Sequence, residues 1–245
     1  MKKKTAMITG AAGGLGQAVV EKLIDQDFMV FVNDNNQKRL DLLAENYDSS
    51  NIYPMCFDVT DEAAWQKAAA TIQEKAEKLD VLFNNAGIFK IATIEDTTVE
   101  LWEKTLTVNT LSMFLGIKEM LPLLGEGSSV INTASIASFL GSKNRIAYAA
   151  SKGAVAALTK AAAIELAPRG IRVNSVHPAY INTQMAEHAA QATDRTKEEM
   201  GQRIPLHNRI STADEVADAV VFLATEGSRF MTGAEMVVDG GQSVN

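Results

Sequence analysis

The stretch Thr-Ala-Met-Ile-Thr-Gly-Ala-Ala-Gly-Gly-Leu-Gly, residues 5–16, joins a short apolar run to a glycine-rich turn. The run Thr5–Thr9 is typical of a buried strand, and a helical pattern begins at Gly14. The turn therefore holds Gly10, Gly14, Leu15 and Gly16 between a strand and a helix. Glycines there let backbone amides approach a pyrophosphate at the positive end of the helix. A tight turn with no ligand would need the same glycines.

Strand-like and helix-like segments alternate along the rest of the chain. The expected strands are Thr5–Thr9, Phe28–Asn33, Ile52–Phe57, Val81–Asn84, Ser129–Asn132, Arg172–Val176 and Glu235–Val238. The expected helices are Gly14–Asp27, Gln37–Asn46, Asp61–Lys78, Val99–Leu124, Tyr148–Ala167 and Ala213–Thr225. This alternation predicts an α/β fold: a single doubly wound (Rossmann) domain over residues 1–245, with about seven parallel strands and helices on both faces.

Composition excludes several classes of protein. Of 245 residues, 47% are hydrophobic and 22% are charged, and the formal net charge of −7 argues against nucleic acid as a partner. Cys56 is the only cysteine, so no intramolecular disulfide can form. The basic start Met1–Lys4 precedes an apolar run too short for a secretion signal, and no run is long enough to span a membrane. We therefore expect a cytoplasmic protein without a membrane partner.

The stretch 181–208 shows no clear periodicity and is mixed in charge. It follows the carboxyl end of an expected strand, which favours a substrate lid. A short pair of surface helices is the alternative.

Acidic residues follow the second and third expected strands. Asp34 comes 20 residues after Gly14, where a carboxylate binds the ribose hydroxyls of NAD and repels the 2′-phosphate of NADP. The turn carries no Arg or Lys, so the sequence favours NAD; Asp34 can also be a helix N-cap. Asp58 and Val59 lie where an adenine would be, although Asp58 can equally be a cap or turn residue.

Tyr148 and Lys152 share one face of an expected helix, because they are four residues apart. A lysine ammonium about 4 Å away favours a tyrosine phenolate by about 4 kcal/mol at an effective dielectric of 20, which moves the tyrosine pKa from about 10 toward neutrality. Such a pair alone is usually a solvated helix face. Ser135 follows the fifth strand at the same sheet edge and can donate a hydrogen bond to a carbonyl oxygen. Ser138 and Ser142 lie further from that strand end.

Together these motifs resemble the short, single-domain branch of the short-chain dehydrogenase/reductases. The resemblance runs from Thr5 to Gly241. It rests on Thr9-Gly10-x-x-x-Gly14-x-Gly16, Asp58-Val59, Asn84-Asn85-Ala86-Gly87, Val108-Asn109, Ser135, Tyr148-x-x-x-Lys152 and Asp239-Gly240-Gly241.

The resemblance implies a role for each matching residue. Tyr148 would be the acid–base that exchanges a proton with an alcohol or ketone oxygen, and Ser135 would hold that substrate oxygen. Lys152 would lower the pKa of Tyr148 and bind the nicotinamide ribose, and Asn109 would keep a water in a proton relay behind it. Asn85, Ala86 and Gly87 would line the adenine ribose and support the fourth strand.

One motif departs from the family. Pro178 is followed by Ala179 where the family usually has glycine, and this restricts the turn. Ile181 and Thr183 still match positions that hold the cofactor carboxamide and a phosphate. Tyr180 would narrow the substrate side or simply pack. The histidines, His177, His188 and His207, have no metal-binding spacing and are interpreted as structural or surface residues, so no metal is expected.

The resemblance implies an NAD-dependent oxidoreductase that interconverts a secondary alcohol and a ketone. An apolar pocket of Phe89, Phe139, Leu140, Tyr180 and Met185 would favour a hydrophobic or small uncharged substrate. Ile204–Arg209 and Thr232-Gly233 resemble 3-oxoacyl-acyl-carrier-protein reductases, which mostly prefer NADPH. A hydroxysteroid or diol dehydrogenase and a non-catalytic dinucleotide-binding protein are further alternatives. By resemblance the long helices at 99–124 and 148–167 would pair in a homotetramer.

Overall fold

The glycine-rich turn connects an inner strand of the sheet to the first helix, as expected from the sequence. Strand β1 (Lys4–Thr9) leads into helix α1 (Gly14–Asp25). The computed structural model describes residues 3–245, so Met1 and Lys2 of the basic start lie outside the described residues.

Seven strands form one fully parallel sheet in the order β3-β2-β1-β4-β5-β6-β7. The order reverses between β1 and β4, which places a crevice at the carboxyl ends of these strands. The doubly wound fold predicted from the sequence is confirmed. The remaining strands are β2 (Phe28–Asp34), β3 (Ile52–Cys56), β4 (Val81–Asn84), β5 (Ser129–Thr133), β6 (Arg172–Pro178) and β7 (Glu235–Val238).

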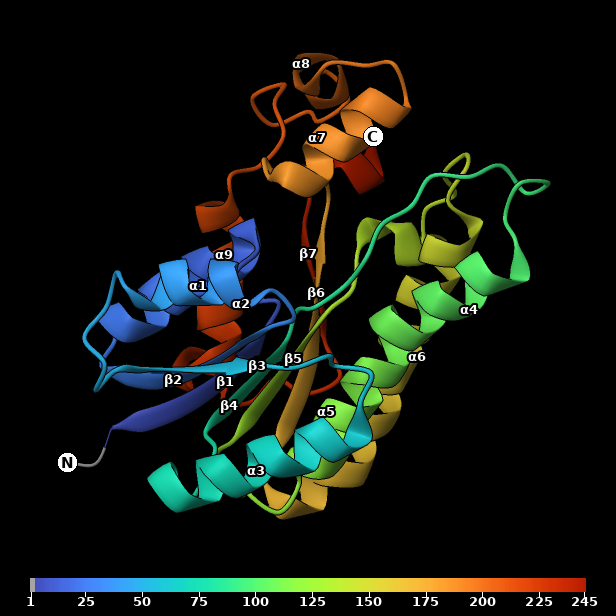
Figure 1. Cartoon of the computed structure of the whole chain (residues 1–245). Helices are drawn as coiled ribbons and strands as arrows, with labels where there is room; N and C mark the ends of the chain where they lie inside the picture. The colour runs from blue at the N-terminus through green and yellow to red at the C-terminus, as the bar shows by residue number, and fades with distance from the viewer. Residues whose placement is uncertain (1–2) are drawn as a thin grey trace.

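Helices cover both faces of the sheet (Figure 1). One face is covered by α1, α2 (Gln37–Ala44) and α9 (Ala213–Ala224). The other face is covered by α3 (Glu62–Ala76), α5 (Ser112–Met120) and α6 (Ile146–Leu166), and α4 (Val99–Leu106) packs on α6.

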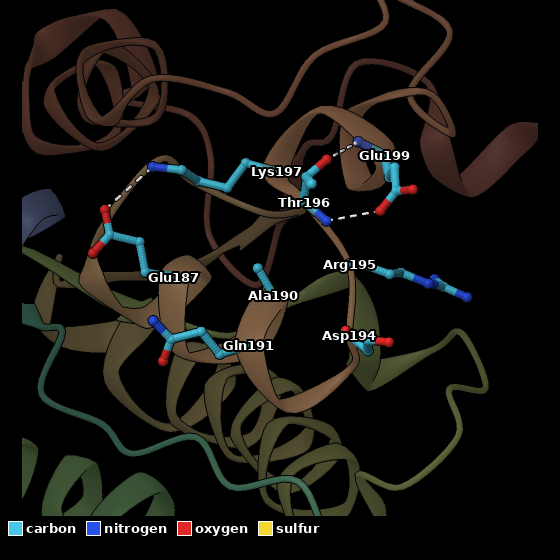
Figure 2. Close-up of a pocket in the computed structure, with 8 residues that line it drawn as sticks. All are labelled: Glu187, Ala190, Gln191, Asp194, Arg195, Thr196, Lys197 and Glu199. Carbon is cyan, nitrogen blue, oxygen red and sulfur yellow. Dashed lines mark hydrogen bonds and ion pairs between the residues drawn. The ribbon is translucent and has the colours of Figure 1, made fainter.

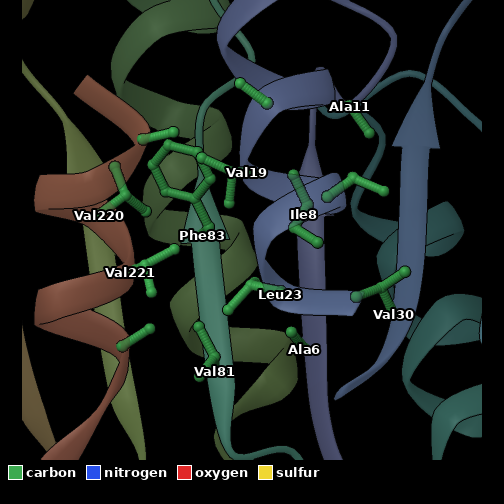
Figure 3. Close-up of a cluster of buried hydrophobic side chains, with 14 of the residues drawn as sticks. Ala6, Ile8, Ala11, Val19, Leu23, Val30, Val81, Phe83, Val220 and Val221 are labelled. Carbon is green, nitrogen blue, oxygen red and sulfur yellow. The ribbon is translucent and has the colours of Figure 1, made fainter. Parts of the chain in front are cut away.

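Each helical layer has its own apolar core. On the first face, Ile8 and Phe83 of the sheet pack against Val19 of α1 and Val220 of α9 (Figure 3). On the second face, Trp65 of α3 is fully buried in the other large cluster. Strands buried on both faces account for the continuous apolar runs in the sequence.

The helix expected at Val99–Leu124 is found over residues 99–120, with one π-helical turn inside it. Helix α4 ends at Leu106, a π-helical turn follows at Thr107–Leu111, and α5 ends at Met120. Pro122 cannot continue an α-helix, which accounts for the early end. Asn109, in the π-helical turn, forms hydrogen bonds to residues distant in the chain, described below. A local sequence pattern does not reveal such bonds.

The stretch 181–208 contains the helix pair that was the alternative prediction. Helices α7 (Gln184–Ala192) and α8 (Lys197–Gly201) lie above the carboxyl ends of β6 and β7 (Figure 1). Met200 and Ile204 belong to a small separate apolar cluster, against which Phe89 and Tyr180 pack. This position over the sheet edge suits a lid, which stays a prediction.

None of the helices within residues 3–245 combines the length and the apolar character that a membrane crossing requires.

Candidate active site

The glycine-rich turn is packed too closely to accept larger residues. Gly10 has a φ of +60°, and a Cβ there would lie 2.9 Å from the Cα of Ala86. A Cβ on Gly16 would overlap with the carbonyl oxygen of Gly10. A Cβ on Gly14 would lie 2.6 Å from Cγ2 of Thr183, so the start of the predicted lid rests on the turn. Close packing therefore accounts for a glycine at each of these three positions.

The amino end of α1 is open to an anion. Its N-cap, Gly13, provides no side-chain hydrogen bond, and its first turn contains no acidic residue. Free backbone amides and the positive end of the helix dipole suit a pyrophosphate. Backbone beside Gly14, Leu15 and Gly16 thus fits the dinucleotide expected there.

Asp34 ends β2 and is buried, with 8% of its surface exposed. Its Oδ1 accepts a hydrogen bond from the backbone amide of Asn36 at 3.1 Å. The alternative interpretation of Asp34 as an N-cap is wrong, because Asn36 caps α2 by accepting from the amide of Arg39 at 3.2 Å. Asp34 therefore has no capping role, and its carboxylate remains a candidate ribose ligand.

Asp58 is a turn residue at the exposed end of the third strand. Its Oδ1 accepts from the amide and the hydroxyl of Thr60, at 2.9 and 2.8 Å. Asp61, not Asp58, caps α3. Val59 is buried, and its carbonyl accepts a 2.9 Å bond from the indole of Trp65.

The segment Asn85–Gly87 is tied to the end of β1. The amides of Asn85 and Ala86 donate to the hydroxyl of Thr9, at 2.9 and 3.0 Å. A Cβ on Gly87 would lie 3.2 Å from Oδ1 of Asn109. These contacts agree with the expectation that this segment supports the fourth strand.

The structure brings Tyr148 and Ser135 together at the carboxyl edge of the sheet. The Ser135 side chain lies close enough to the Tyr148 phenol to lower its pKa through hydrogen bonding, although 13 residues separate them in the chain. Burial raises the pKa of the Tyr148 phenol, while the bond to Ser135 and the positive charge of Arg145 act in the opposite direction. The Ser138 hydroxyl does not join this pair: it donates to the backbone carbonyl of Ser135 at 2.6 Å and lies 2.9 Å from Nδ1 of His177.

Lys152 is buried on the same helix, and its ammonium donates to the carbonyl of Thr133 at 2.6 Å. Its Nζ lies 5.7 Å from the centroid of the Tyr148 ring. Burial lowers the pKa of Lys152 to about 7. Burial is thus the largest influence on both pKa values, and the lowering of the Tyr148 pKa by Lys152 stays a prediction.

Asn109 is fully buried in the π-helical turn. Its Oδ1 accepts from the amide of Ile88 at 2.8 Å, and its Nδ2 donates to the carbonyl of Ile88 and to the hydroxyl of Ser151, each at 3.0 Å. These bonds tie the loop after β4 to α6. The water relay behind Lys152 stays a prediction.

The segment after β6 accepts Ala179 without strain. Ala179 is not among the non-glycine residues with positive φ, so the missing glycine costs nothing in backbone conformation. Its amide donates to the carbonyl of Val238 at 3.2 Å, while the carbonyl of Pro178 lies 3.5 Å from the hydroxyl of Ser135. Ile181 pairs with Ser211 in a short bridge.

An aromatic wall with one arginine stands beside the catalytic candidates. Phe89 packs edge-to-face on Tyr148 with ring centroids 4.9 Å apart. The guanidinium of Arg145 lies over Phe89 and over Tyr180, 5.3 and 5.2 Å from the ring centroids. Phe89 and Tyr180 belong to the pocket expected from the sequence. Arg145 was not expected there, because it belongs to no motif. Met185 and Phe139 of the expected pocket are largely exposed.

His177 is structural, as expected. It is buried, and its Nε2 lies 2.8 Å from the hydroxyl of Ser175. His188 and His207 are exposed. Within residues 3–245, no cluster of His, Cys, Asp or Glu side chains could hold a metal ion.

A cavity of about 470 Å³ opens in the α7–α8 segment and is separate from the catalytic candidates (Figure 2). Lys197 and Glu187 form a 3.2 Å ion pair across it. Its lining residues are Glu187, Ala190, Gln191, Asp194, Arg195, Thr196, Lys197 and Glu199. The residues grouped around Tyr148 contribute nothing to this cavity.

Comparison with known proteins agrees with this arrangement. The family model described as enoyl-(acyl carrier protein) reductase matches residues 10–243. The chain is 38% identical over 250 residues to trans-4-hydroxycyclohexanecarboxylate dehydrogenase of Sinomonas cyclohexanicum, covering 98% of this chain and 93% of the relative. It is 35% identical over 246 residues to cyclopentanol dehydrogenase of a Comamonas strain, covering 99% and 98%.

A third relative, the NADP-dependent (R)-specific alcohol dehydrogenase of Lentilactobacillus kefiri, is 35% identical over 251 residues, covering 98% of this chain and 97% of the relative. Among solved structures, a short-chain dehydrogenase/reductase from Brucella melitensis superimposes with a TM-score of 0.93 at 29% identity, covering 99% of this chain and 97% of that one. All of these proteins are named as dehydrogenases, one of them as NADP-dependent, and the matches run over nearly the whole chain. The chain therefore belongs to the short-chain dehydrogenase/reductase family.

Proposed function

We propose that the chain is an NAD(H)-dependent oxidoreductase that interconverts a secondary alcohol and a ketone, with Tyr148 as the acid–base. The grouping of Tyr148, Ser135 and Lys152 at the carboxyl edge of the sheet carries this proposal. A protein that only binds a dinucleotide would have no need for a hydroxyl pair and a buried lysine beside the crevice.

The proton chemistry follows from the contacts of Tyr148. In ketone reduction the phenol donates its proton to the substrate oxygen, and in alcohol oxidation the phenolate takes the hydroxyl proton. Ser135 would hold the same oxygen through its hydroxyl. The nicotinamide supplies or accepts the hydride at the carbinol carbon. Because burial raises the pKa of Tyr148, the phenol is protonated at neutral pH and suits reduction, and oxidation should rise with pH.

For the cofactor we propose NAD. Gly10, Gly14 and Gly16 would admit the pyrophosphate, Asp34 would bind the ribose hydroxyls, and Asp58 and Val59 would lie by the adenine. Further contacts would come from residues 85–87, Tyr148 and Lys152, and from Pro178, Ile181 and Thr183. The NADP-dependent relative shows that the family also accepts the other cofactor. The buried Asp34 carboxylate, which would repel a 2′-phosphate, decides our choice.

For the substrate we propose a secondary alcohol with an apolar, ring-sized body. Phe89 packs on Tyr148, and Tyr180 and Phe89 adjoin the apolar cluster under α7 and α8. Two of the relatives are named for alcohols on five- and six-membered carbon rings.

A 3-oxoacyl-acyl-carrier-protein reductase is the second candidate. The matching family model is described by an acyl-carrier-protein reductase, and Ile204–Arg209 resembles that group. An acyl-carrier substrate should be reduced faster than a free ring ketone if this candidate is correct. We further propose a cytoplasmic homotetramer.

The first experiment is a fluorescence titration of the purified protein with NADH and with NADPH. Tight binding of NADH alone supports the NAD proposal, and tight binding of NADPH alone contradicts it and favours the carrier-protein reductase. Binding of neither would leave the enzyme proposal without its cofactor.

The Tyr148→Phe variant tests the acid–base role. We expect turnover of cyclopentanol or cyclohexanol to fall by about 100-fold or more, within the usual contribution of general acid–base catalysis, while the dissociation constant for NADH stays within about threefold. Steady-state rates and the same titration measure both quantities. An active variant, or one that no longer binds NADH, contradicts the proposed role.

A further inference from the structure

Arg145 is the one guanidinium placed directly against the aromatic wall of the candidate active site within residues 3–245. It occupies the N-cap position of α6, three residues before Tyr148, and its side chain makes no capping hydrogen bond. Instead the side chain lies between the rings of Phe89 and Tyr180, and Nη2 donates to the Tyr180 hydroxyl.

The hydrogen-bonding capacity of Arg145 is largely unused. A guanidinium carries five N–H donors, and one side-chain bond, to Tyr180, is present. Its Nε is buried without any hydrogen-bond partner. None of the ion pairs formed by the described residues includes Arg145. Buried donors without partners are rare, and a positive charge with no counter-ion at a site points to an anionic ligand.

Arg145 and the candidate acid–base contact the same ring. Phe89 packs on Tyr148 from one side and carries the guanidinium of Arg145 on its face. A substrate of about one ring's width, with its oxygen at Tyr148 and Ser135, can therefore place a substituent at Arg145. The apolar cluster beneath α7 and α8 packs against Phe89 and Tyr180 beside this place.

We propose that Arg145 binds a carboxylate of the substrate, so that the preferred substrate is a ring-bearing hydroxy acid or oxo acid rather than an uncharged alcohol. This inference rests on the proposed oxidoreductase function and refines its substrate class. The planar fork of a guanidinium matches two carboxylate oxygens, and its stacking on two rings holds it in position for them. The sequence-based expectation of an uncharged substrate overlooked this charge.

The test compares 4-hydroxycyclohexanecarboxylate with its carboxamide, which has the same shape and no charge. For the unmodified enzyme we expect kcat/KM to be about 100-fold higher for the acid, a usual effect of one charged hydrogen-bonded pair at a desolvated site. Equal values for acid and amide, or a preference for the amide, would overturn the proposal without any variant.

Two variants locate the effect. Arg145→Met should reduce the acid-to-amide ratio of kcat/KM to about one, and Arg145→Lys, which keeps the charge and loses the fork, should leave an intermediate ratio. Lys143→Met is the matched control, because it removes the same charge from an exposed side chain two residues away. It should keep the ratio within about threefold. Each variant should bind NADH with the same dissociation constant as the unmodified protein, which shows that the variant is folded.

The outcomes separate this inference from the proposed function. If cyclohexanol is oxidised in a Tyr148-dependent manner and the acid is not preferred, the carboxylate site is wrong and the oxidoreductase stands. If Arg145→Met slows acid and amide equally and shifts the pH profile, Arg145 acts on the Tyr148 pKa and the carboxylate site is again wrong. If no secondary alcohol or ketone reacts with NAD or NADP, the proposed function itself fails.

Discussion

Lys152 and Tyr148 lie four residues apart on α6, and burial acts on their pKa values in opposite directions. It raises the pKa of the phenol and lowers that of the ammonium to about 7, because the charged form of each is disfavoured away from water. The phenol is therefore uncharged at neutral pH, and only part of the Lys152 amine carries a charge there. A bound anion near Nζ would restore the lysine charge, so the residues of this site depend on one another and on their ligand.

The lysine makes stability depend on pH. In the range between about 7 and 10.5 the unfolded chain binds a proton at Lys152 and the folded chain does not, so the free energy of unfolding rises with pH. Between pH 7 and 9.5 the ligand-free protein should gain about 3 kcal/mol relative to Lys152→Met, at 1.36 kcal/mol per unit. Urea unfolding of both proteins at several pH values measures this difference. A constant gap between them would show that Lys152 keeps its charge in the folded state.

Asp34 should determine the cofactor preference. Replacing it in Asp34→Ala should weaken NADH binding by about tenfold or more, since a charge-assisted hydrogen bond is lost. The double change Asp34→Ser and Asn35→Arg should favour NADPH. Asp41→Ala, at an exposed position on α2, is the control for the change in net charge. An unchanged ratio of NADH to NADPH affinities in the Asp34 variants would refute the ribose role.

At the scale of elements, the site depends on how loops are held against α1 and α6. Asn109 ties the loop after β4 to α6 through Ile88 and Ser151, and Thr183 rests on Gly14 of α1. The uncapped start of α1 faces the crevice where the strand order reverses. Helices and loops far apart in the chain therefore form the two sides of one crevice.

The glycine turn offers a test with an internal control. Gly16→Ala would force a methyl group against the Gly10 carbonyl and should destabilise the protein by about 1–3 kcal/mol, as overpacking does, and abolish NADH binding. Gly125→Ala meets no atom within 4 Å and should change stability by less than about 0.5 kcal/mol. Chemical denaturation and NADH titration measure the two effects. Normal NADH binding by Gly16→Ala would mean that the turn can relax and is not a fitted cradle.

At the scale of the whole molecule, α4, α5 and α6 carry apolar side chains that no other part of the described chain covers. Phe114 is 49% exposed and Ile164 is 76% exposed. Exposed apolar groups that gather in one patch are typical of an interface between subunits. The family resemblance implies that these same helices pair in a homotetramer.

We expect light scattering to give a mass four times the 26.4 kDa of one chain. Phe114→Glu should lower that mass, because it places a charge in the expected interface. Leu42→Glu is the control, since Leu42 is 63% exposed on α2, on the opposite face of the sheet. A monomer in the unmodified protein, or an equal effect of both variants, contradicts the proposed assembly.

Local sequence patterns by themselves determined the order of strands and helices, the glycine turn and the strand-end positions of Asp34 and Ser135, and the family resemblance singled out Tyr148 and Lys152. These depend on short-range periodicity, on turn chemistry and on which residues follow a strand, and all of that is written within a few neighbouring positions. The parallel sheet then brings the strand ends to one edge.

Only the tertiary structure decided the π-helical turn at Thr107–Leu111, the helix pair after β6 and the burial that lowers the pKa of Lys152. It also decided the place of Arg145 between Phe89 and Tyr180. Each depends on contacts between segments distant in the chain: hydrogen bonds of Asn109 that widen a helical turn, desolvation that shifts a pKa, and rings from two loops that enclose a charge. No local pattern carries that information.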